Sequence, residues 1–507
     1  MIKRLDLSRN ERRRPDWPSR NEPSDGHLFS SRTPLRKIVV LVDAELLADI
    51  APVKPSDPRT VDPRMLLAGL LDHPLVRLYR YADDGPPSTV ERTTEAFGAT
   101  VYKGWAVLTD REPREGVWEV VYPTDGGSSM SAVIGNAPDV AANDTKTDVY
   151  RELNPQIARE RRRADVLAAQ VASQALQADI YVTERQYLHR PSWRVADGVT
   201  LCRPEEALPI LSLYFRAQGE FLIAPRFRFN RGLFFWVGTR ELLPEAWRWF
   251  SACVQHATAS GDDGLLLLGG SLLQRVDRAL EARDAIHVAL NQPQNNDLRE
   301  DALANLDVVL VLLMGAVDVA ARVAHRVLGL SPASEFSAAW QARKKNGWLD
   351  LVRARRPTLA AVVDAGTPHE RTLTILRLLR NSVHGAALQG MGVLRRGAPR
   401  ESLVGLPADD EATLLGAMNA LGGPASWGVR PLLPGRSHVD PGVLVDRLFE
   451  AVVDLLNDLM ARTPVELLSD VNLSARDSQP SQASRAGGDL DPFAPWIRQS
   501  IRLQLGF

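Results

Sequence analysis

The sequence predicts an α/β domain with a parallel sheet, followed by a C-terminal helical bundle. Over residues 37–190, short apolar runs of strand length alternate with longer segments of helical periodicity. From residue 265 to residue 465 the apolar residues recur almost throughout at helical spacing. The length of 507 residues is compatible with two to four domains at roughly 150 residues each.

The composition is that of a protein without a large charged field. The net charge is −1, so any contact with a nucleic acid has to use a local basic patch. The two cysteines, Cys202 and Cys253, exclude a disulfide framework and a cysteine-rich zinc site. The first residues lack the apolar run of a signal peptide, and the apolar run 308–317 is too short to span a bilayer. We therefore expect a cytoplasmic protein with no membrane partner.

The first domain is predicted to begin after a polar arm. Residues 1–36 are rich in Arg, Pro, Ser and Asp and are expected to be disordered, with Arg12–Arg14 as the part that could touch phosphates. The segment 37–43 is continuously apolar and β-branched, which is typical of a strand buried on both faces of a parallel sheet. The other elements expected in this domain are strands at 75–81, 100–108, 117–122 and 179–183 and a helix over 148–176.

Residues 191–264 are interpreted as a connecting module with an aromatic hairpin. Apolar and polar residues alternate on both sides of Asn230-Arg231-Gly232, which predicts a turn between two strands. The aromatic residues of this segment could stack on bases, but their alternation favours a half-buried strand pair.

The second domain, residues 265–465, is predicted to be a bundle of helices. A long apolar helix is expected over 303–323, with Asp307, Asp318 and Arg322 as its polar members. Further helices are expected near 336–353, 371–384, 410–421 and 441–461, the last one started by Asp440 and Pro441. Residues 466–507 are predicted to be a linker and a C-terminal peptide that docks onto its own chain.

One segment of the helical domain combines groups suited to phosphodiester chemistry. In a helix, Arg380 and His384 share a face, Arg377 lies one turn before Arg380, and Asn381 adjoins them. Arginine keeps its charge and holds phosphate oxygens through paired hydrogen bonds, and histidine transfers protons near neutral pH. Arginine and histidine near the C-terminus of a helix also interact favourably with the helix dipole. A purely structural role for these residues is therefore the alternative.

The same residues resemble the HEPN domain (higher eukaryotes and prokaryotes nucleotide-binding). That all-α family carries an arginine, often followed by a polar residue, and a histidine four to six residues later. The resemblance implies a metal-independent RNase whose site forms between two copies of the motif, hence a homodimer. Arg380-Asn381 has the Arg-polar pair, yet three residues separate Arg380 from His384; Arg377 has six, but Leu378 follows it. Either Arg377 is the motif arginine, or the motif is shortened.

Acidic residues mark the first domain. Asp43 ends the first strand, where ligands bind in open α/β sheets. Asp165 begins the helical segment 165–173, and Glu184 follows the strand that ends at Thr183. Carboxylates that converge at strand ends could hold Mg²⁺ or Mn²⁺ and activate water.

Asp43, Asp165 and Glu184 occur in the order found in PIN-like nucleases, whose domain is a Rossmann-like α/β fold. The resemblance covers residues 37–190 and implies a metal-dependent nuclease site. It also implies an intervening acid, for which Glu91 and Glu95 on an expected helix and Asp148 are the candidates.

We expect from these observations an endoribonuclease that acts on RNA, with a role in stress response or phage defence implied by the family resemblances. The alternatives are a dimeric RNA-binding or scaffold protein without catalysis, and a first domain that senses a nucleotide. The sequence has no phosphate-binding Gly-x-x-x-x-Gly-Lys loop, no Gly-x-Gly-x-x-Gly after a strand and no His-Glu-x-x-His. Nucleoside triphosphatase, dehydrogenase and zinc protease functions therefore lack support.

Overall fold

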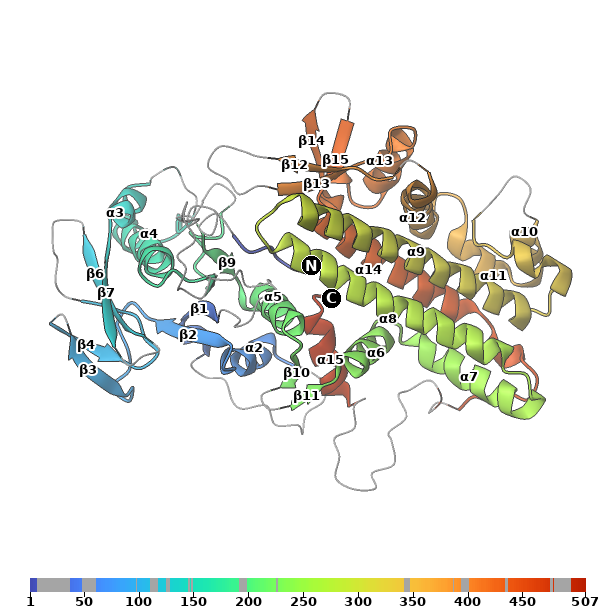
Figure 1. Ribbon diagram of the computed structural model, residues 1–507, viewed down its shortest axis with the longest axis horizontal. Coiled ribbons are helices and arrows are strands. Elements are labelled where there is room, and N and C mark those ends of the chain that lie inside the picture. Colours follow the sequence, from blue (N-terminus) through green and yellow to red (C-terminus); the bar gives the residue numbers. More distant parts are fainter. Residues whose placement is uncertain are drawn as a thin grey trace, which may run out of the picture.

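Four parallel strands form the central sheet of the N-terminal half in the computed structural model of the protein (Figure 1). The spatial order is β2-β1-β8-β9, with every neighbouring pair parallel. The bounds of these strands are Ile38–Asp43 (β1), Val76–Tyr81 (β2), Ile180–Val182 (β8) and Thr200–Cys202 (β9). The structure describes residues 1–6, 37–47, 61–96, 98–109, 117–124, 128–144, 146, 149–190, 198–224, 227–341, 347–385, 387–393, 401–433, 436–474, 477 and 494–507.

Helices cover both faces of this sheet, which explains why β1 has no polar alternation. All six residues of β1 are buried. Val40 packs in a cluster with α2 and α5, whereas Leu41 packs in a second cluster on the other face with α4. The helices are α2 (Pro63–Leu71), α4 (Pro155–Gln170), which continues as a π turn at Val171–Ala175, and α5 (Pro204–Ala217). The α/β character predicted for this half is therefore confirmed.

Smaller elements flank the sheet on the side away from the helical half (Figure 1). They are two antiparallel sheets and a short helix: β3 (Arg92–Ala96) with β4 (Ala99–Tyr102); β5 (Val107–Leu108), β6 (Trp118–Pro123) and β7 (Ser129–Ile134); and α3 (Ala137–Ala142). The helix expected at Glu91 and Glu95 is wrong, because this stretch is paired with β4 as strand β3. Asp148 lies outside the described residues.

The segment 191–264 differs from its prediction in two ways. The parallel sheet continues into it through β9, so the predicted boundary at residue 190 lies inside the sheet. The aromatic hairpin is placed differently: β10 (Phe221–Ala224) pairs with β11 (Phe227–Phe229), but the chain then enters α6 (Arg231–Leu242). Asn230 starts this helix, because its side chain accepts a hydrogen bond of 2.8 Å from the amide of Leu233. Asn230-Arg231-Gly232 is thus the start of a helix and not the turn of a hairpin.

The C-terminal half is largely helical. Long helices α8 and α9 run side by side and pack with α12 and α14 around one apolar core (Figure 1). The helix bounds are α7 (Glu245–Ser260), α8 (Gly264–Leu290), α9 (Asn296–Val327), α10 (Trp348–Arg355), α11 (Pro357–Ala360), α12 (Pro368–His384), α13 (Glu411–Ala420) and α14 (Pro441–Arg462). The start signal at Asp440 is confirmed, since its side chain accepts from the amides of Gly442 and Val443. By length and composition α9 could cross a membrane, but 56% of its most apolar window is buried inside the protein.

An antiparallel sheet interrupts the helices, so the expectation of an all-α domain is wrong in this part. Its spatial order is β12-β13-β15-β14, with bounds Gly390–Val393 (β12), Glu401–Gly405 (β13), Val429–Leu433 (β14) and Arg436–Val439 (β15). The strands have four or five residues each, and β13 pairs with a strand more than thirty residues further along the chain. Such non-local pairing leaves no clear period in the sequence.

Both ends of the chain pack between the two halves. Residues 1–6 belong to the predicted disordered arm, yet Ile2 and Leu5 are buried, and the amide of Ile2 donates to Asp446 on α14 at 3.1 Å. Arg12–Arg14 lie outside the described residues. The C-terminal helix α15 (Pro495–Gln504) packs on α5 and α6, which confirms that this peptide docks onto its own chain.

Candidate functional site

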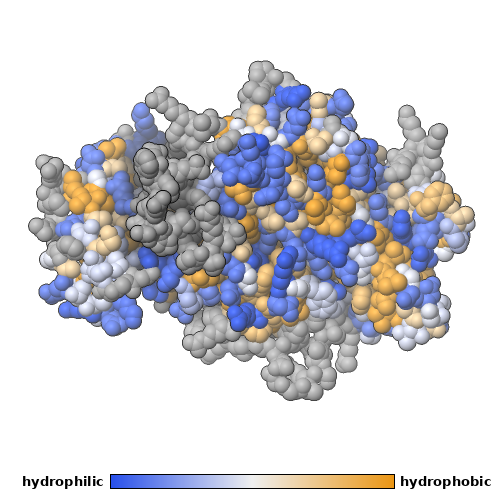
Figure 2. Space-filling view, viewed as in Figure 1, coloured by the Kyte–Doolittle hydropathy of each residue, from blue (hydrophilic) through white to orange (hydrophobic). Residues whose placement is uncertain are grey.

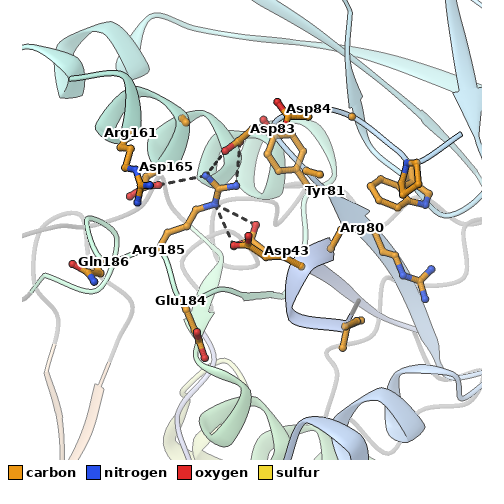
Figure 3. Close-up of a pocket in the computed structure, with 18 of the residues that line it drawn as sticks. Asp43, Arg80, Tyr81, Asp83, Asp84, Arg161, Asp165, Glu184, Arg185 and Gln186 are labelled. Atoms are coloured by element: carbon orange, nitrogen blue, oxygen red, sulfur yellow. Dashed lines mark hydrogen bonds and ion pairs between the residues drawn. The ribbon is translucent and has the colours of Figure 1, made fainter. Parts of the chain in front are cut away.

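A cavity opens at the carboxyl ends of the parallel strands, where ligands of open α/β sheets bind (Figure 3). Its volume is about 940 Å³. The parallel register sets Asp43 of β1 beside Tyr81 of β2 and Val42 beside Val182 of β8. The segments that follow β1, β2 and β8 therefore meet at one end of the sheet, and α4 contributes Asp165 from the side.

Asp43 is held at the bottom of this cavity by three donors. Its carboxylate accepts hydrogen bonds from the Tyr181 hydroxyl at 2.7 Å and the Thr183 hydroxyl at 2.6 Å. The Nε of Arg185 lies 3.2 Å from both of its oxygens. Burial raises the pKa of Asp43 above the ordinary value of a carboxyl group, and Arg185 and the two hydroxyls offset part of that rise.

Asp165 contacts Arg185 from another side than Asp43 and is also largely buried. The Tyr150 hydroxyl donates to it at 2.7 Å, and the Nη1 of Arg185 lies 3.4 Å away. Burial raises the pKa of Asp165, while Tyr150 and Arg185 lower it in part. Asp43 and Asp165, which the sequence paired, are thus brought to one site.

Glu184 lines the same cavity but does not contact the two aspartates. Its carboxylate forms an exposed ion pair of 2.6 Å with Arg64, and Figure 3 shows it directed away from Asp43. The third carboxylate of the site is Asp83, which accepts from both terminal nitrogens of Arg185 at 3.1 Å. Sequence reasoning missed Asp83, although Asp83 lies just after the end of β2 in the same way that Asp43 lies at the end of β1. Of the proposed additional acids, Glu91 pairs with Lys103 on the surface and Glu95 is exposed.

The donor set as arranged does not fit a divalent cation. Within the described ranges, no group of three or more His, Cys, Asp or Glu side chains is placed to hold a metal ion. The guanidinium of Arg185 lies between the three carboxylates (Figure 3) and donates to each of them. The expected Mg²⁺ or Mn²⁺ remains a prediction from the sequence.

The second candidate site lies on α12 in the helical half. The hydroxyl of Thr367 caps the helix by accepting from the amide of Glu370, and Pro368 follows at the first helical position. The buried face of α12, which includes Leu376 and Leu379, packs in the bundle core. The remaining face carries the groups singled out by the sequence.

Arg377, Arg380 and Asn381 line a cavity of about 630 Å³ beside α9. Both arginines are half-buried, and Asn381 is exposed. Among the described residues, no carboxylate lies within ion-pair distance of either guanidinium, although Asp318 and Glu370 line the same cavity. Two arginines that form no ion pair with any described residue leave their hydrogen-bond donors available for an anion.

His384 is the last residue of α12 and is exposed. It lies seven residues after Arg377, which places it on the same side of the helix about 10 Å further along the axis. It does not line the cavity that contains the arginines, and no hydrogen bond involves its ring within the described part of the chain. The imidazole is therefore open to solvent at the end of the helix.

Comparison of the chain with models of protein families, with curated proteins and with solved structures found no match.

Proposed function

We propose that this protein is a metal-independent endoribonuclease whose RNA site lies on α12 of the helical half. The observation that carries the proposal is the pair of half-buried arginines, Arg377 and Arg380, which share a cavity and have no carboxylate partner among the described residues. Charged groups that are withdrawn from water need a partner of opposite charge. A phosphodiester supplies that charge, and its two non-bridging oxygens can accept the paired N–H donors of a guanidinium group.

Arg377 and Arg380 form a local pair of cations in this cavity, which Asp318 and Glu370 also line. With a net charge of −1, the protein has no general attraction for RNA, so affinity has to come from a local patch. Asn381, exposed beside the two arginines, adds an amide that can accept from a ribose hydroxyl or donate to a phosphate oxygen.

His384 is the group that we propose for proton transfer. In the reaction the 2′-oxygen of the ribose attacks the adjacent phosphorus, and the bond from phosphorus to the 5′-oxygen of the next nucleotide breaks. The 2′-hydroxyl proton goes to a base, and the departing 5′-oxygen takes a proton from an acid, which leaves a 2′,3′-cyclic phosphate and a 5′-hydroxyl. Imidazole performs either transfer near neutral pH, and the guanidiniums stabilise the charge on phosphorus.

The reaction needs two proton transfers, but each chain supplies only one imidazole in this proposal. A site shared by two copies of the chain would supply both groups. We propose that the helical halves form a homodimer that brings two α12 helices together. The neighbouring helix α9 offers apolar contacts for this, because Val308 and Val311 are 45% and 38% exposed one turn apart. Figure 2 shows hydrophobic surface interspersed with hydrophilic residues over this part of the molecule.

The family resemblances fit this assignment. A HEPN-like origin for the helical half is supported by the bundle of long helices and by the Arg-polar pair Arg380-Asn381 near the end of α12. A PIN-like origin for the first half is supported by Asp43 at the end of β1, Asp165 on α4 and Thr183 after β8. A role in stress response or phage defence remains part of the proposal.

The test is to incubate the purified protein with RNA in the presence and absence of EDTA and to identify the ends of the products. We expect cleavage that is equal in both conditions and gives 2′,3′-cyclic phosphate and 5′-hydroxyl ends. Cleavage that EDTA abolishes and that Asp43→Asn removes would place the chemistry in the first half instead. RNA binding without any cleavage would favour the non-enzymatic scaffold, and either result would overturn the proposal.

A further inference from the structure

We infer that the guanidinium of Arg185 takes the place of a divalent cation in the first half, and that removing it would expose a site for Mn²⁺ or Mg²⁺. The inference concerns the cavity at the end of the parallel sheet and is independent of the RNA site on α12.

Three carboxylates from three different elements converge on this one side chain. Asp43 comes from the end of β1, Asp83 from the turn after β2, and Asp165 from α4. Arg185 donates through Nε to Asp43 at 3.2 Å, through both terminal nitrogens to Asp83 at 3.1 Å, and through Nη1 to Asp165 at 3.4 Å. A guanidinium has five N–H donors in a fixed plane, so one side chain can donate to all three carboxylates.

The charges require a cation at this position. Asp43 is 1% exposed and Asp165 is 4% exposed, and buried carboxylates that face each other stay ionised only beside positive charge. The side chain of Arg185 is itself only 11% exposed. Arg185 therefore has the same electrostatic role that a metal ion has among converging carboxylates.

Arg185 and a metal ion cannot occupy the site together. Mg²⁺ and Mn²⁺ need carboxylate oxygens at about 2.0–2.2 Å, whereas the nitrogens of Arg185 lie 3.1–3.4 Å from those same oxygens. A metal ion between the carboxylates would overlap with the position of the guanidinium group, and its charge would repel that of Arg185. The hydroxyls of Tyr181 and Thr183 also occupy lone pairs of Asp43.

The backbone fixes Arg185 in this position. Its amide donates to the hydroxyl of Thr183 at 3.1 Å, which closes a tight turn directly after β8. The guanidinium lies over the ring of Tyr81, with 5.8 Å between Cζ and the ring centroid. Turn, ring and three carboxylates together hold the side chain in one arrangement.

The experiment measures Mn²⁺ binding to the full chain by calorimetry and Tb³⁺ binding by luminescence sensitised through the nearby tyrosines. The wild-type protein should show neither signal at this site. Arg185→Ala should bind one Mn²⁺, gain a Tb³⁺ signal and melt a few degrees higher when Mn²⁺ is saturating. Arg185→Lys keeps the positive charge and should behave as the wild type, and Arg185→Ala combined with Asp43→Asn should lose the gained signals.

Two results would overturn the inference. One is a wild-type protein that binds one Mn²⁺ and loses it on Asp43→Asn, because the metal would then displace Arg185. The other is a folded Arg185→Ala protein that binds no Mn²⁺. If Arg185→Ala folds only when Mn²⁺ is supplied, the inference is supported; if it does not fold with Mn²⁺ either, the wild-type measurement decides.

Discussion

Replacing both Arg377 and Arg380 by alanine should change the salt dependence of RNA binding by a calculable amount. Each phosphate that a cation neutralises adds about 0.7 to the slope of log K against log salt for a single strand. Neither arginine has a carboxylate partner among the described residues, so each is free to neutralise one phosphate. The double variant should therefore lose about 1.4 from the slope. A rise from about 50 to about 200 mM salt would then weaken wild-type binding about sevenfold more than binding by the variant.

The assay is a series of RNA titrations at several salt concentrations, read by fluorescence anisotropy. Arg353→Ala is the matched control, because it also removes a guanidinium from the helical half. Arg353 already pairs with Asp350 at 2.7 Å and with Asp364 at 3.0 Å, so its loss should leave the slope near the wild-type value. An unchanged slope in the double variant, or an equal change in the control, would refute the reasoning.

Further predictions concern stability. Gly238→Ala would place a new Cβ 2.9 Å from the Cδ1 of Leu505 on the C-terminal segment, so it should lower the free energy of unfolding in denaturant by about 1–3 kcal/mol. Gly416→Ala has open space around it and should raise the free energy of unfolding by up to about 1 kcal/mol. Equal free energies of unfolding for the two variants would contradict this packing. Asp446→Asn should destabilise the protein by about 3–5 kcal/mol, because it leaves Arg283, which is 0% exposed, without its partner at 2.6 Å. Burial alone would raise the pKa of Asp446, but Arg283 and a neighbouring histidine outweigh it and hold that pKa well below the ordinary range. The stability that this carboxylate contributes is therefore complete above about pH 4 and is lost as the pH falls further, so wild-type unfolding should depend more steeply on acid than unfolding of Asp446→Asn.

The elements predicted correctly are those with a strong local signal. The six buried residues of β1 have the continuous β-branched pattern of a strand covered on both faces. Helix α14 begins at the expected cap, Asp440, and α9 contains the whole predicted apolar helix. Periodicity and capping chemistry determine such elements with little help from the rest of the chain.

The elements predicted wrongly depend on distant parts of the chain. The aromatic alternation after Phe227 has the period of a strand, but Asn230 caps a helix there because the following residues pack on α8 and α15. In the sheet of β12 to β15, the pairing of β13 with β15 joins residues more than thirty positions apart, which no local window contains.

The candidate sites show the same contrast. Asp43 and Asp165 were found because each stands at a recognisable place in an α/β pattern. Arg185 was missed, since a basic residue after a strand has no distinguishing pattern until its three carboxylates are seen around it. On α12 the helical spacing alone places Arg377, Arg380 and Asn381 together, but their shared cavity depends on α9 and the segment that precedes α10.

The most direct test of the account is the single-turnover rate of RNA cleavage by His384→Ala. General acid–base catalysis by one side chain contributes about 10²- to 10⁴-fold, so the rate should fall by about 100-fold or more while RNA affinity stays near the wild-type value. His369→Ala on the same helix is the control, because His369 already pairs with Asp458 at 3.0 Å and lies at the opposite end of α12 from His384. We expect the control to cleave at the wild-type rate. A wild-type rate in His384→Ala would contradict the proposed catalytic role of α12.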